Sequence, residues 1–240
     1  MKFENTEVFN FGCAIRGMRN PLESWSKSDT VYGTYWGEID GHKCFDGDGF
    51  CIGKNDLELM QKLIRAGSEH RKFMRQIMVS VDITAPLYWW KEFDTYKVGT
   101  VANSTSTMHK LASTEITMDC FEMGDFDCNI YVYDVDNEQV KTWKFWKKHL
   151  IPFLEELRKE YNETKDKRYW KELIRLLPES WLQKRTVTMN YENLLNMCAK
   201  GQRRFHKLSE WSVDFISWAR SLPYAQELIF IDELFLKKGE

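Results

Sequence analysis

The chain has 240 residues, of which 43% are hydrophobic and 15% aromatic, with a formal net charge of −2 at pH 7. This composition excludes a disordered chain and favours one substantial core, so we expect a single domain over residues 1–240. The balanced charge argues against nucleic acid as a partner, and the lack of a long apolar run or a secretion signal predicts no membrane span and a cytoplasmic location.

The N-terminal region is predicted to contain a strand, a turn and a helix. Residues 7–15 are expected to form an opening strand, followed by a turn that carries Arg16 and Arg19. These two arginines could bind a phosphate, or they could be ordinary surface residues. Asn55 and Glu58 have the spacing of a capping box, which predicts a helix that starts there.

A connector dense in ionisable groups follows the helix, at residues 68–76. Glu69, His70 and Arg75 are candidate site residues because several cations lie beside one carboxylate just before a predicted strand. A solvated connector is the alternative explanation.

Residues 79–110 form the stretch around which the rest of the chain is expected to be organised. Apolar and polar residues alternate from Val79 to Thr84, which is typical of a half-buried strand. Thr84 is predicted to cap a helix that has Pro86 in its first turn. This helix should run to about Lys97 and stop at Gly99, a residue suited to a left-handed cap.

A polar run without formal charge, rich in hydroxyl and amide groups, occupies residues 100–107. It could be a solvated loop. Its apolar flanks, with Trp89 and Phe93 before it and Leu111 after it, instead favour a segment held at the wall of a pocket.

The C-terminal half is predicted to be mostly helical. A turn and a strand are expected within residues 120–135, helices at 139–161 and 165–177, a short strand at 185–190, and helices at 191–199, from 202 onward, and at 224–235. The first of these helices should place five apolar residues in the core: Trp143, Trp146, Leu150, Phe153 and Leu157.

One edge of the helix expected from residue 202 onward carries four ionisable residues. Arg203, His206, Lys207 and Glu210 have the spacing i, i+3, i+4 and i+7. Such an edge could bind a phosphate or the polar edge of a flavin, and a salt-bridged surface explains it equally well.

The six cysteines are expected to be reduced thiols, because none forms a Cys-x-x-Cys pair and their spacing matches no zinc ribbon or finger. Cys198 has no activating neighbour in the sequence and is not predicted to be a nucleophile. The segment Asp46-Gly47-Asp48-Gly49 lacks the longer ligand series of a calcium loop, so no metal site is predicted.

The order of these parts resembles that of the flavin-dependent thymidylate synthases. Asp82-Ile83-Thr84-Ala85-Pro86-Leu87-Tyr88 is similar to the junction at which, in that family, a strand leads into a helix started by Ala-Pro. Leu177-Pro178 and Thr188-Met189-Asn190 match later landmarks. The resemblance covers roughly residues 55–210.

The family signature, Arg-His-Arg-x-x-Ser-x-Asn-Glu-x-Ser-x-Arg-Tyr, is altered in this chain. In register from the Ala-Pro pair, its positions fall on Thr95, Tyr96 and Lys97, then Thr100, then Ala102 and Asn103, then Thr105, and finally Thr107 and Met108. Hydroxyl groups and one cation remain, while the arginines that contact flavin and nucleotide in the family are absent.

The resemblance implies an α/β (α+β) fold with a central, mostly antiparallel sheet and flanking helices. It also implies a homotetramer that holds FAD and dUMP at subunit interfaces and uses methylenetetrahydrofolate and NADPH as cosubstrates for reductive methylation. A non-catalytic nucleotide-binding relative and a different flavin- or folate-dependent one-carbon transferase are the alternatives.

The site residues are assigned on the resemblance together with the polar and basic segments described above. Predicted catalytic residues are Tyr96, Lys97 and Asn103. Predicted cofactor-binding residues are Glu69, His70, Arg75, Thr100, Ser104, Thr105, Ser106, Asn190 and His206. Predicted substrate-binding residues are Lys97, Thr107, Arg203, Arg204, Lys207 and Glu210.

Overall fold

The computed structural model describes residues 1–33, 38–39, 42–43, 50–133, 136–199 and 202–236. The segment Asp46-Gly47-Asp48-Gly49 lies outside these residues. By its internal contacts the chain divides into two compact units. Unit 1 comprises residues 1–4, 82–95 and 102–187, and unit 2 comprises residues 5–81, 96–101 and 188–240. The single domain expected from the sequence stays a prediction.

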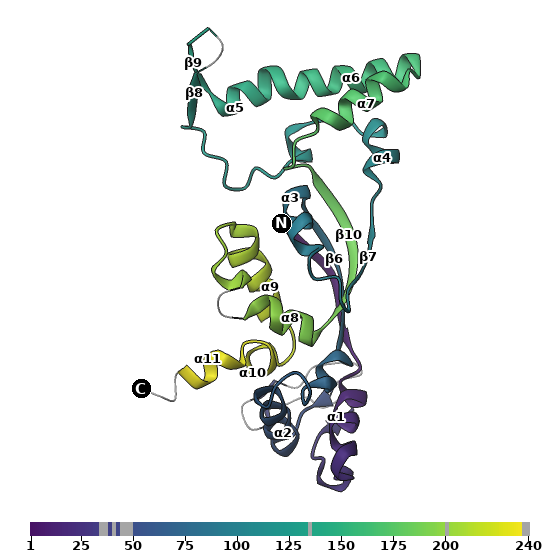
Figure 1. Ribbon diagram of the computed structural model, residues 1–240, viewed down its shortest axis with the longest axis vertical. Helices are drawn as coiled ribbons and strands as arrows, with labels where there is room; N and C mark the ends of the chain where they lie inside the picture. Colours follow the sequence, from purple (N-terminus) through teal and green to yellow (C-terminus); the bar gives the residue numbers. More distant parts are fainter. Residues whose placement is uncertain (34–37, 40–41, 44–49, 134–135, 200–201, 237–240) are drawn as a thin grey trace. The chain divides into compact units, whose positions relative to one another are not determined.

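A four-stranded sheet is the central element, and part of each of its strands belongs to each unit. Its strand order is β1 (Lys2–Phe9), β6 (Met78–Pro86), β10 (Leu182–Asn190) and β7 (Val101–Ser104), with β6, β10 and β7 side by side in Figure 1. Val79, Val81, Ile83 and Ala85 of β6 are all buried, as the alternation predicts. The predicted α/β class, with a central antiparallel sheet and flanking helices, is confirmed.

Unit 2 is mainly helical. Its helices are α1 (Phe11–Arg19), α2 (Lys54–Arg65), α8 (Tyr191–Cys198), α9 (Ile216–Arg220), α10 (Ala225–Leu228) and α11 (Ile231–Leu236). Two small antiparallel pairs join β2 (Val31–Tyr32) to β5 (Phe50–Cys51) and β3 (Glu38–Ile39) to β4 (His42–Lys43).

The opening strand predicted at residues 7–15 is wrong in its position. The strand is β1, and Asn10 then turns the chain with a left-handed φ of 73°, after which α1 begins. Helix α1 buries Phe11, Ala14, Ile15 and Met18, which have the i, i+3, i+4, i+7 spacing of a helix. Residues 11–15 therefore belong to a helix and not to the end of the strand.

Helix α2 has no capping box of its own, contrary to the prediction. Gly53 is its N-cap residue and makes no side-chain bond. The carboxylate of Asp29 instead accepts hydrogen bonds from the backbone N–H groups of Asn55 and Asp56, at 2.8 and 3.1 Å. A residue distant in sequence therefore supplies the acceptor that the helix start requires.

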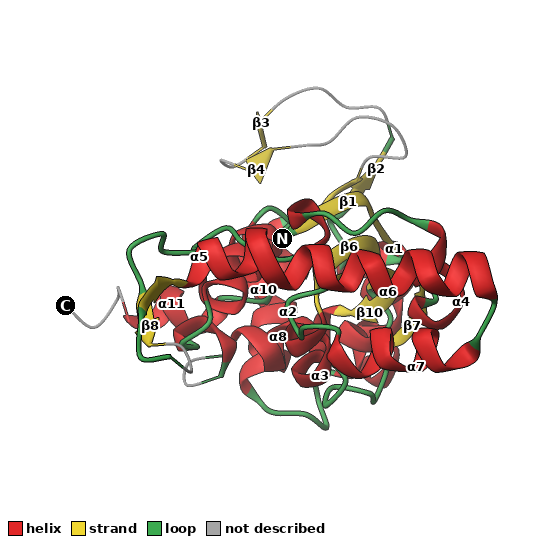
Figure 2. Ribbon diagram, turned by 90° about the horizontal axis from the view of Figure 1, so that it is seen from above, coloured by secondary structure: helices red, strands yellow, loops and turns green. Residues whose placement is uncertain are grey.

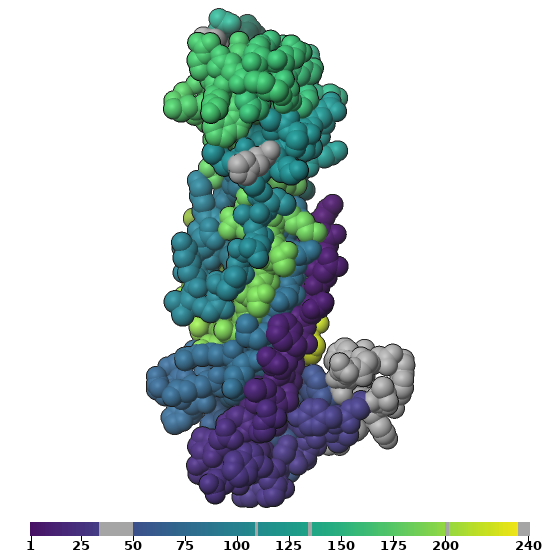
Figure 3. Space-filling model, turned by 90° about the vertical axis from the view of Figure 1, so that its right-hand side faces the viewer, coloured from purple at the N-terminus to yellow at the C-terminus, as the bar shows by residue number. Residues whose placement is uncertain are grey.

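Unit 1 contains a helical pair and a small hairpin. Its elements are α3 (Leu87–Phe93), α4 (Thr107–Lys110), β8 (Tyr131–Tyr133), β9 (Gln139–Lys141), α5 (Thr142–Phe145), a π-helical segment (Trp146–Leu150), α6 (Ile151–Thr164) and α7 (Lys167–Leu176). Helices α6 and α7 lie side by side in Figures 1 and 2, and Figure 3 shows the surface of α7 in green. Among the described helices, none has the length and apolar character that a bilayer span requires.

The junction after β6 differs from the prediction. The strand continues through Thr84 to Pro86, and Pro86, with φ −70° and ψ 156°, is the N-cap of α3. A residue that precedes proline is disfavoured in the helical region, which keeps Ala85 extended. Helix α3 ends at Phe93, so residues 94–100 form turns, and Gly99 has a left-handed φ of +80° within them.

The core of unit 1 is centred on Leu154, which is fully buried and packs with Leu173 and Phe121. Trp146, Leu150 and Leu157 are partly buried against this cluster, as predicted, whereas Phe153 is 54% exposed. Leu154 lies four residues after Leu150 and three before Leu157, so the buried face passes through Leu154 and leaves Phe153 at its edge.

Replacing Leu154 by alanine is expected to lower the free energy of unfolding by about 2–5 kcal/mol, because it leaves a cavity in a fully buried cluster. Phe153→Ala, one residue away on an exposed position, should change it by no more than about 0.5 kcal/mol. Urea unfolding of both variants measures the difference. A larger loss from Phe153→Ala would contradict the observed register.

Candidate functional site

The predicted site residues fall into groups that lie within one unit or the other. In unit 2, Arg203 is the centre of a cluster with Tyr96, His206 and Trp211, which we call the Arg203 cluster. The guanidinium carbon of Arg203 lies 4.7 Å from the centre of the Trp211 ring and 5.3 Å from that of Tyr96. Its Nε donates a hydrogen bond to the Tyr96 hydroxyl at 3.1 Å. Stacking of this kind fixes the plane of the guanidinium, a group whose geometry suits bidentate contact with oxyanions.

The turn that carries Tyr96 is fixed by local polar contacts. The hydroxyl of Thr100 donates to the Tyr96 carbonyl at 2.8 Å, and the Asn193 side chain donates to the carbonyl that precedes Gly99 at 2.7 Å. Asn190 and Asn193 form a reciprocal capping box at the start of α8. A Cβ on Gly99 would lie 2.9 Å from the Asn190 amide nitrogen, so this close approach requires glycine. Thr100 and Asn190 thus position the backbone around Tyr96.

The single helical edge predicted for residues 203–210 is wrong. A short 3₁₀ turn (Arg203–Phe205) is followed by extended backbone at His206, and a π-helical segment (Glu210–Phe215) leads into α9. The imidazole Nδ1 of His206 accepts a hydrogen bond from the backbone N–H of Leu208 at 3.1 Å. In a continuous helix that N–H would donate to a backbone carbonyl one turn earlier, so this side-chain bond replaces a helical one. The structure keeps His206 beside Trp211, with ring centres 6.5 Å apart. Lys207 is exposed and Glu210 is buried.

Arg204 has carboxylate partners within unit 2. Its guanidinium donates to both oxygens of Asp232, at 3.0 and 2.9 Å, and to the Cys198 carbonyl at 3.0 Å. Glu233 lies 3.1 Å away. This bidentate pair ties α11 to the end of α8, so a phosphate would have to displace Asp232 to reach Arg204.

The connector residues of unit 2 have separate environments. Arg75 and Arg71 both pair with the Glu192 carboxylate. Burial alone would raise the pKa of Glu192, but the hydrogen bonds from the two arginines outweigh it and hold the pKa below its usual value. Glu69 and His70 instead line an open groove of about 1070 Å³.

Two of the predicted residues in unit 1, Asn103 and Ser104, lie exposed on β7, the edge strand of the sheet. Lys97 of unit 2 is exposed as well. The segment after β7 is more strongly held, because the N–H and the hydroxyl of Thr105 both donate to the Lys184 carbonyl, at 2.9 and 3.2 Å. Of the polar run, the residues from Thr105 onward therefore have a fixed conformation.

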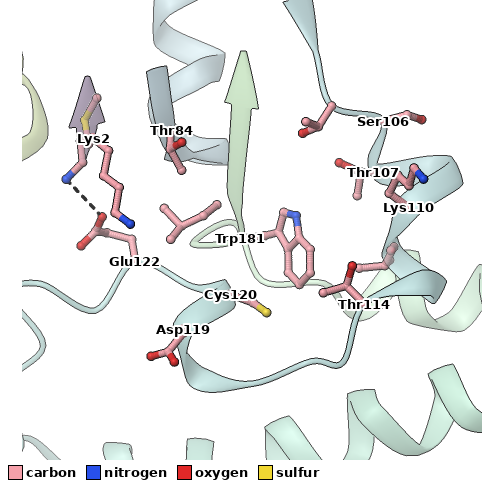
Figure 4. Close-up of a pocket in the computed structure, with 14 residues that line it drawn as sticks. Lys2, Thr84, Ser106, Thr107, Lys110, Thr114, Asp119, Cys120, Glu122 and Trp181 are labelled. Atoms are coloured by element: carbon pink, nitrogen blue, oxygen red, sulfur yellow. Dashed lines mark ion pairs between the residues drawn. The ribbon is translucent and has the colours of Figure 1, made fainter. Parts of the chain in front are cut away.

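Unit 1 contains a cavity of about 530 Å³ whose wall includes Thr105, Ser106 and Thr107 (Figure 4). Trp181 provides an aromatic face in the middle of this cavity, and Lys110 lies at its side beside Thr107. The predicted arrangement of a polar run at a pocket wall is therefore present at these three residues.

Several residues that shape the cavity were not found from the sequence. Gln183 is almost fully buried, and its amide donates to the Thr105 carbonyl at 2.9 Å and to the Thr107 hydroxyl at 3.3 Å. Trp181 and Cys120 come from two loops that meet only in the folded chain. The isolated bridge between Phe121 and Trp181 joins these loops, and no periodic pattern marks either of them.

The residues of the cavity suit a flat heterocycle. Hydroxyl groups both donate and accept, as the carbonyl and N–H edges of a pyrimidine or a flavin ring require, and the Trp181 face offers a stacking surface. The volume lies in the range of small-molecule sites. Lys2 and Lys110 add positive charge to the wall, and Asp119 and Glu122 add negative charge.

At the level of sequence, no protein-family model and no curated protein matches the chain. At the level of structure, it is similar to the flavin-dependent thymidylate synthase ThyX from Helicobacter pylori in complex with FAD and dUMP. That match has a TM-score of 0.61 and 18% identity over 97% of this chain and 99% of the other. It is also similar to the UMP/dUMP methylase PolB from Streptomyces cacaoi bound with 5-Br dUMP, with a TM-score of 0.54 and 12% identity over 96% and 95% of the two chains.

Proposed function

Because the chain has the fold of the flavin-dependent thymidylate synthases, we propose that it is a flavoenzyme that reductively methylates a pyrimidine deoxynucleotide, dUMP. FAD is the proposed cofactor, with methylenetetrahydrofolate and NADPH as cosubstrates, and a cytoplasmic homotetramer is the proposed assembly. The observation that carries this proposal is the structural similarity to a synthase whose structure contains FAD and dUMP. The similarity extends over nearly the whole length of both chains.

The cavity of unit 1 is the proposed site for a flat ring, of the flavin or of the nucleotide. Trp181 would stack on the ring, and the hydroxyl groups of Thr105, Ser106 and Thr107 would bond its polar edge. The Arg203 cluster is the proposed phosphate-binding group of unit 2, where Tyr96 holds the guanidinium in one orientation. Asn103, Ser104, Lys97 and Lys207 are exposed and remain proposed site residues that another subunit would cover.

Bound FAD would supply the hydride chemistry, and the chain would supply position and polarity. Tyr96, which accepts a hydrogen bond from Arg203, and His206, which lies beside Trp211, carry exchangeable protons, and in this proposal they donate or accept a proton at the edge of the bound nucleotide. Lys97 falls on the third signature position, where the family has an arginine. Its compact ammonium lacks the planar, two-pronged guanidinium of arginine, so it would contact a phosphate as a single point charge.

The absorbance of the purified protein tests this proposal with the least material. Flavin bands should be present or should appear when FAD is added, and NADPH oxidation should depend on dUMP. The product should be heavier than dUMP by one methylene group when methylenetetrahydrofolate is supplied. A protein that takes up no FAD, with or without dUMP, would refute the assignment.

Cys120 provides an internal reporter of occupancy in the cavity. We expect FAD or dUMP to slow its alkylation by iodoacetamide several-fold, because the thiol is part of the cavity wall. Cys13 and Cys128 are exposed elsewhere and should react at unchanged rates, which provides a control within the same molecule. Peptide mass spectrometry measures all three rates. Equal rates for Cys120 with and without both ligands would place the ring outside this cavity.

A non-catalytic nucleotide-binding protein is the second candidate function. The observation that favours it is that two predicted site residues have carboxylate partners: Arg204, predicted to bind substrate, pairs with Asp232, and Arg75, predicted to bind cofactor, pairs with Glu192. This alternative predicts dUMP binding without dUMP-dependent NADPH oxidation, so measured turnover would exclude it.

A further inference from the structure

A basic hollow in unit 1 lies on elements that the proposed function does not use. It has a volume of about 450 Å³ and is formed by the β8–β9 hairpin and the helix that follows it. Three lysines and one histidine line it: Lys141, Lys144, Lys148 and His149. No carboxylate is among the described residues of its wall. The sequence itself contains no aspartate or glutamate from Gln139 to Leu154.

The three lysines reach the hollow from two adjoining elements. Lys141 ends β9, and Lys144 and Lys148, four residues apart in the helix that follows, lie on one helical face. The π-helical turn Trp146–Leu150 widens the helix at this point and lets His149, the next residue after Lys148, lie on the same wall. Such turns inside α-helices are frequent at functional sites.

The hairpin is fixed against the start of this helix. Residues Tyr131–Tyr133 pair with Gln139–Lys141, and the N–H of Thr142 donates to the Ile130 carbonyl at 3.1 Å. The ammonium of Lys141 lies 5.1 Å from the centre of the Tyr131 ring, and both residues line the hollow.

We propose that this hollow binds the triphosphate group of a nucleoside triphosphate. Three lysines on one wall, with no carboxylate among its described residues, match the high negative charge of linked phosphates, and lysine binds phosphate as a point charge without demanding one geometry. Tyr131, which is 46% exposed, and the Gln139 amide lie on the same wall, where an aromatic face and an amide suit a nucleobase. The volume of about 450 Å³ lies in the range of small-molecule sites.

Calorimetric titration of the full chain with ATP and with inorganic triphosphate tests this site. Saturating dUMP should be present, so that a pyrimidine site elsewhere does not contribute, and the ionic strength should be about 0.15 M to screen diffuse attraction. We expect both probes to bind. The double variant Lys144→Gln/Lys148→Gln should weaken both by at least about tenfold, because two charge-assisted contacts are lost.

Lys171→Gln, an exposed lysine on α7 of the same unit, is the matched control and should leave both affinities unchanged. Lys144 and Lys148 are themselves exposed, so circular dichroism should show that the double variant folds normally. Unchanged affinity in the double variant, or no binding by the parent chain, would overturn the proposal. Tighter binding of single-stranded oligothymidylate than of ATP would also overturn it and would assign the surface to nucleic acid.

Discussion

Replacing Arg203 by alanine should reduce kcat/KM for dUMP-dependent NADPH oxidation by about 100-fold, the loss expected for a bidentate, charge-assisted phosphate contact. The structure supports a large effect because the guanidinium is already oriented by the Tyr96 hydroxyl and by two aromatic rings. Initial rates at several dUMP concentrations measure it, and most of the loss should appear in KM.

Two further variants separate the charge of Arg203 from its orientation. Arg203→Lys should recover part of the activity, since it keeps the charge but lacks the planar fork. Tyr96→Phe keeps the ring and removes only the hydroxyl that accepts from Nε, so we expect a loss of several-fold. Arg65→Ala, an exposed arginine on α2, serves as the control. Full activity in Arg203→Ala would remove the Arg203 cluster from the proposed site.

Replacing Asp56 by asparagine should lower the free energy of unfolding by about 3–5 kcal/mol, because it leaves a buried charge without its partner. Asp56 is fully buried, and Arg19 is 4% exposed and donates to it at 2.7 Å. The other carboxylate oxygen accepts hydrogen bonds from the hydroxyls of Ser28 and Thr30, at 2.7 and 2.6 Å, and from two backbone N–H groups. The carboxylate therefore joins the loop that precedes β2 to both α1 and α2.

The same pair should make stability depend on pH in the acid range. Burial alone would raise the pKa of Asp56, but hydrogen bonds from Thr30, Ser28 and Arg19 outweigh it and hold the pKa below its usual value. Since the folded-state pKa is below the value of about 3.9 in unfolded chains, the stabilisation is complete above about pH 4 and is lost as the pH falls through the folded-state pKa. Urea unfolding at several pH values should show this loss in the parent chain and a smaller one in Asp56→Asn.

Adding Arg19→Met to Asp56→Asn should restore part of the stability, because the second change removes the orphaned charge and leaves an apolar side chain in its place. Glu58→Gln, an exposed carboxylate on the same helix, should change the free energy of unfolding by no more than about 0.5 kcal/mol. If Asp56→Asn were as stable as Glu58→Gln, the buried pair would not contribute as described.

The sequence correctly predicted those elements whose signal is local. The alternation in β6 reflects the two-residue period of a strand that is buried on one face, and the helices α2, α6, α7 and α8 follow their apolar periods. The start of α8 lies at the predicted Thr-x-Asn landmark because Asn190 caps it through its own neighbours. The order of these parts was sufficient to identify the fold, which the structural similarities confirm.

The candidate site was only partly predictable, because its residues meet through contacts distant in sequence. The pairing of Tyr96 with Arg203 joins residues more than a hundred positions apart, and the sequence offered both only as separate candidates. Trp181, which precedes β10, and Gln183, near the start of that strand, shape the cavity around Thr107, and neither was singled out by the sequence. The pairing of Arg204 with Asp232 likewise joins two residues that no local pattern in the sequence connects.

The sequence by itself determined the composition of a folded chain, the strand and helix periods, and the landmarks that place it in the thymidylate synthase-like fold. Only the tertiary structure decided where helices begin and which face they bury, since Asp29 caps α2 from a distance and Leu154, in place of Phe153, lies in the core of unit 1. It also decided which cations have carboxylate partners. The physical reason is that periodicity records only whether a side chain is buried, whereas partner and charge state depend on groups brought together by folding.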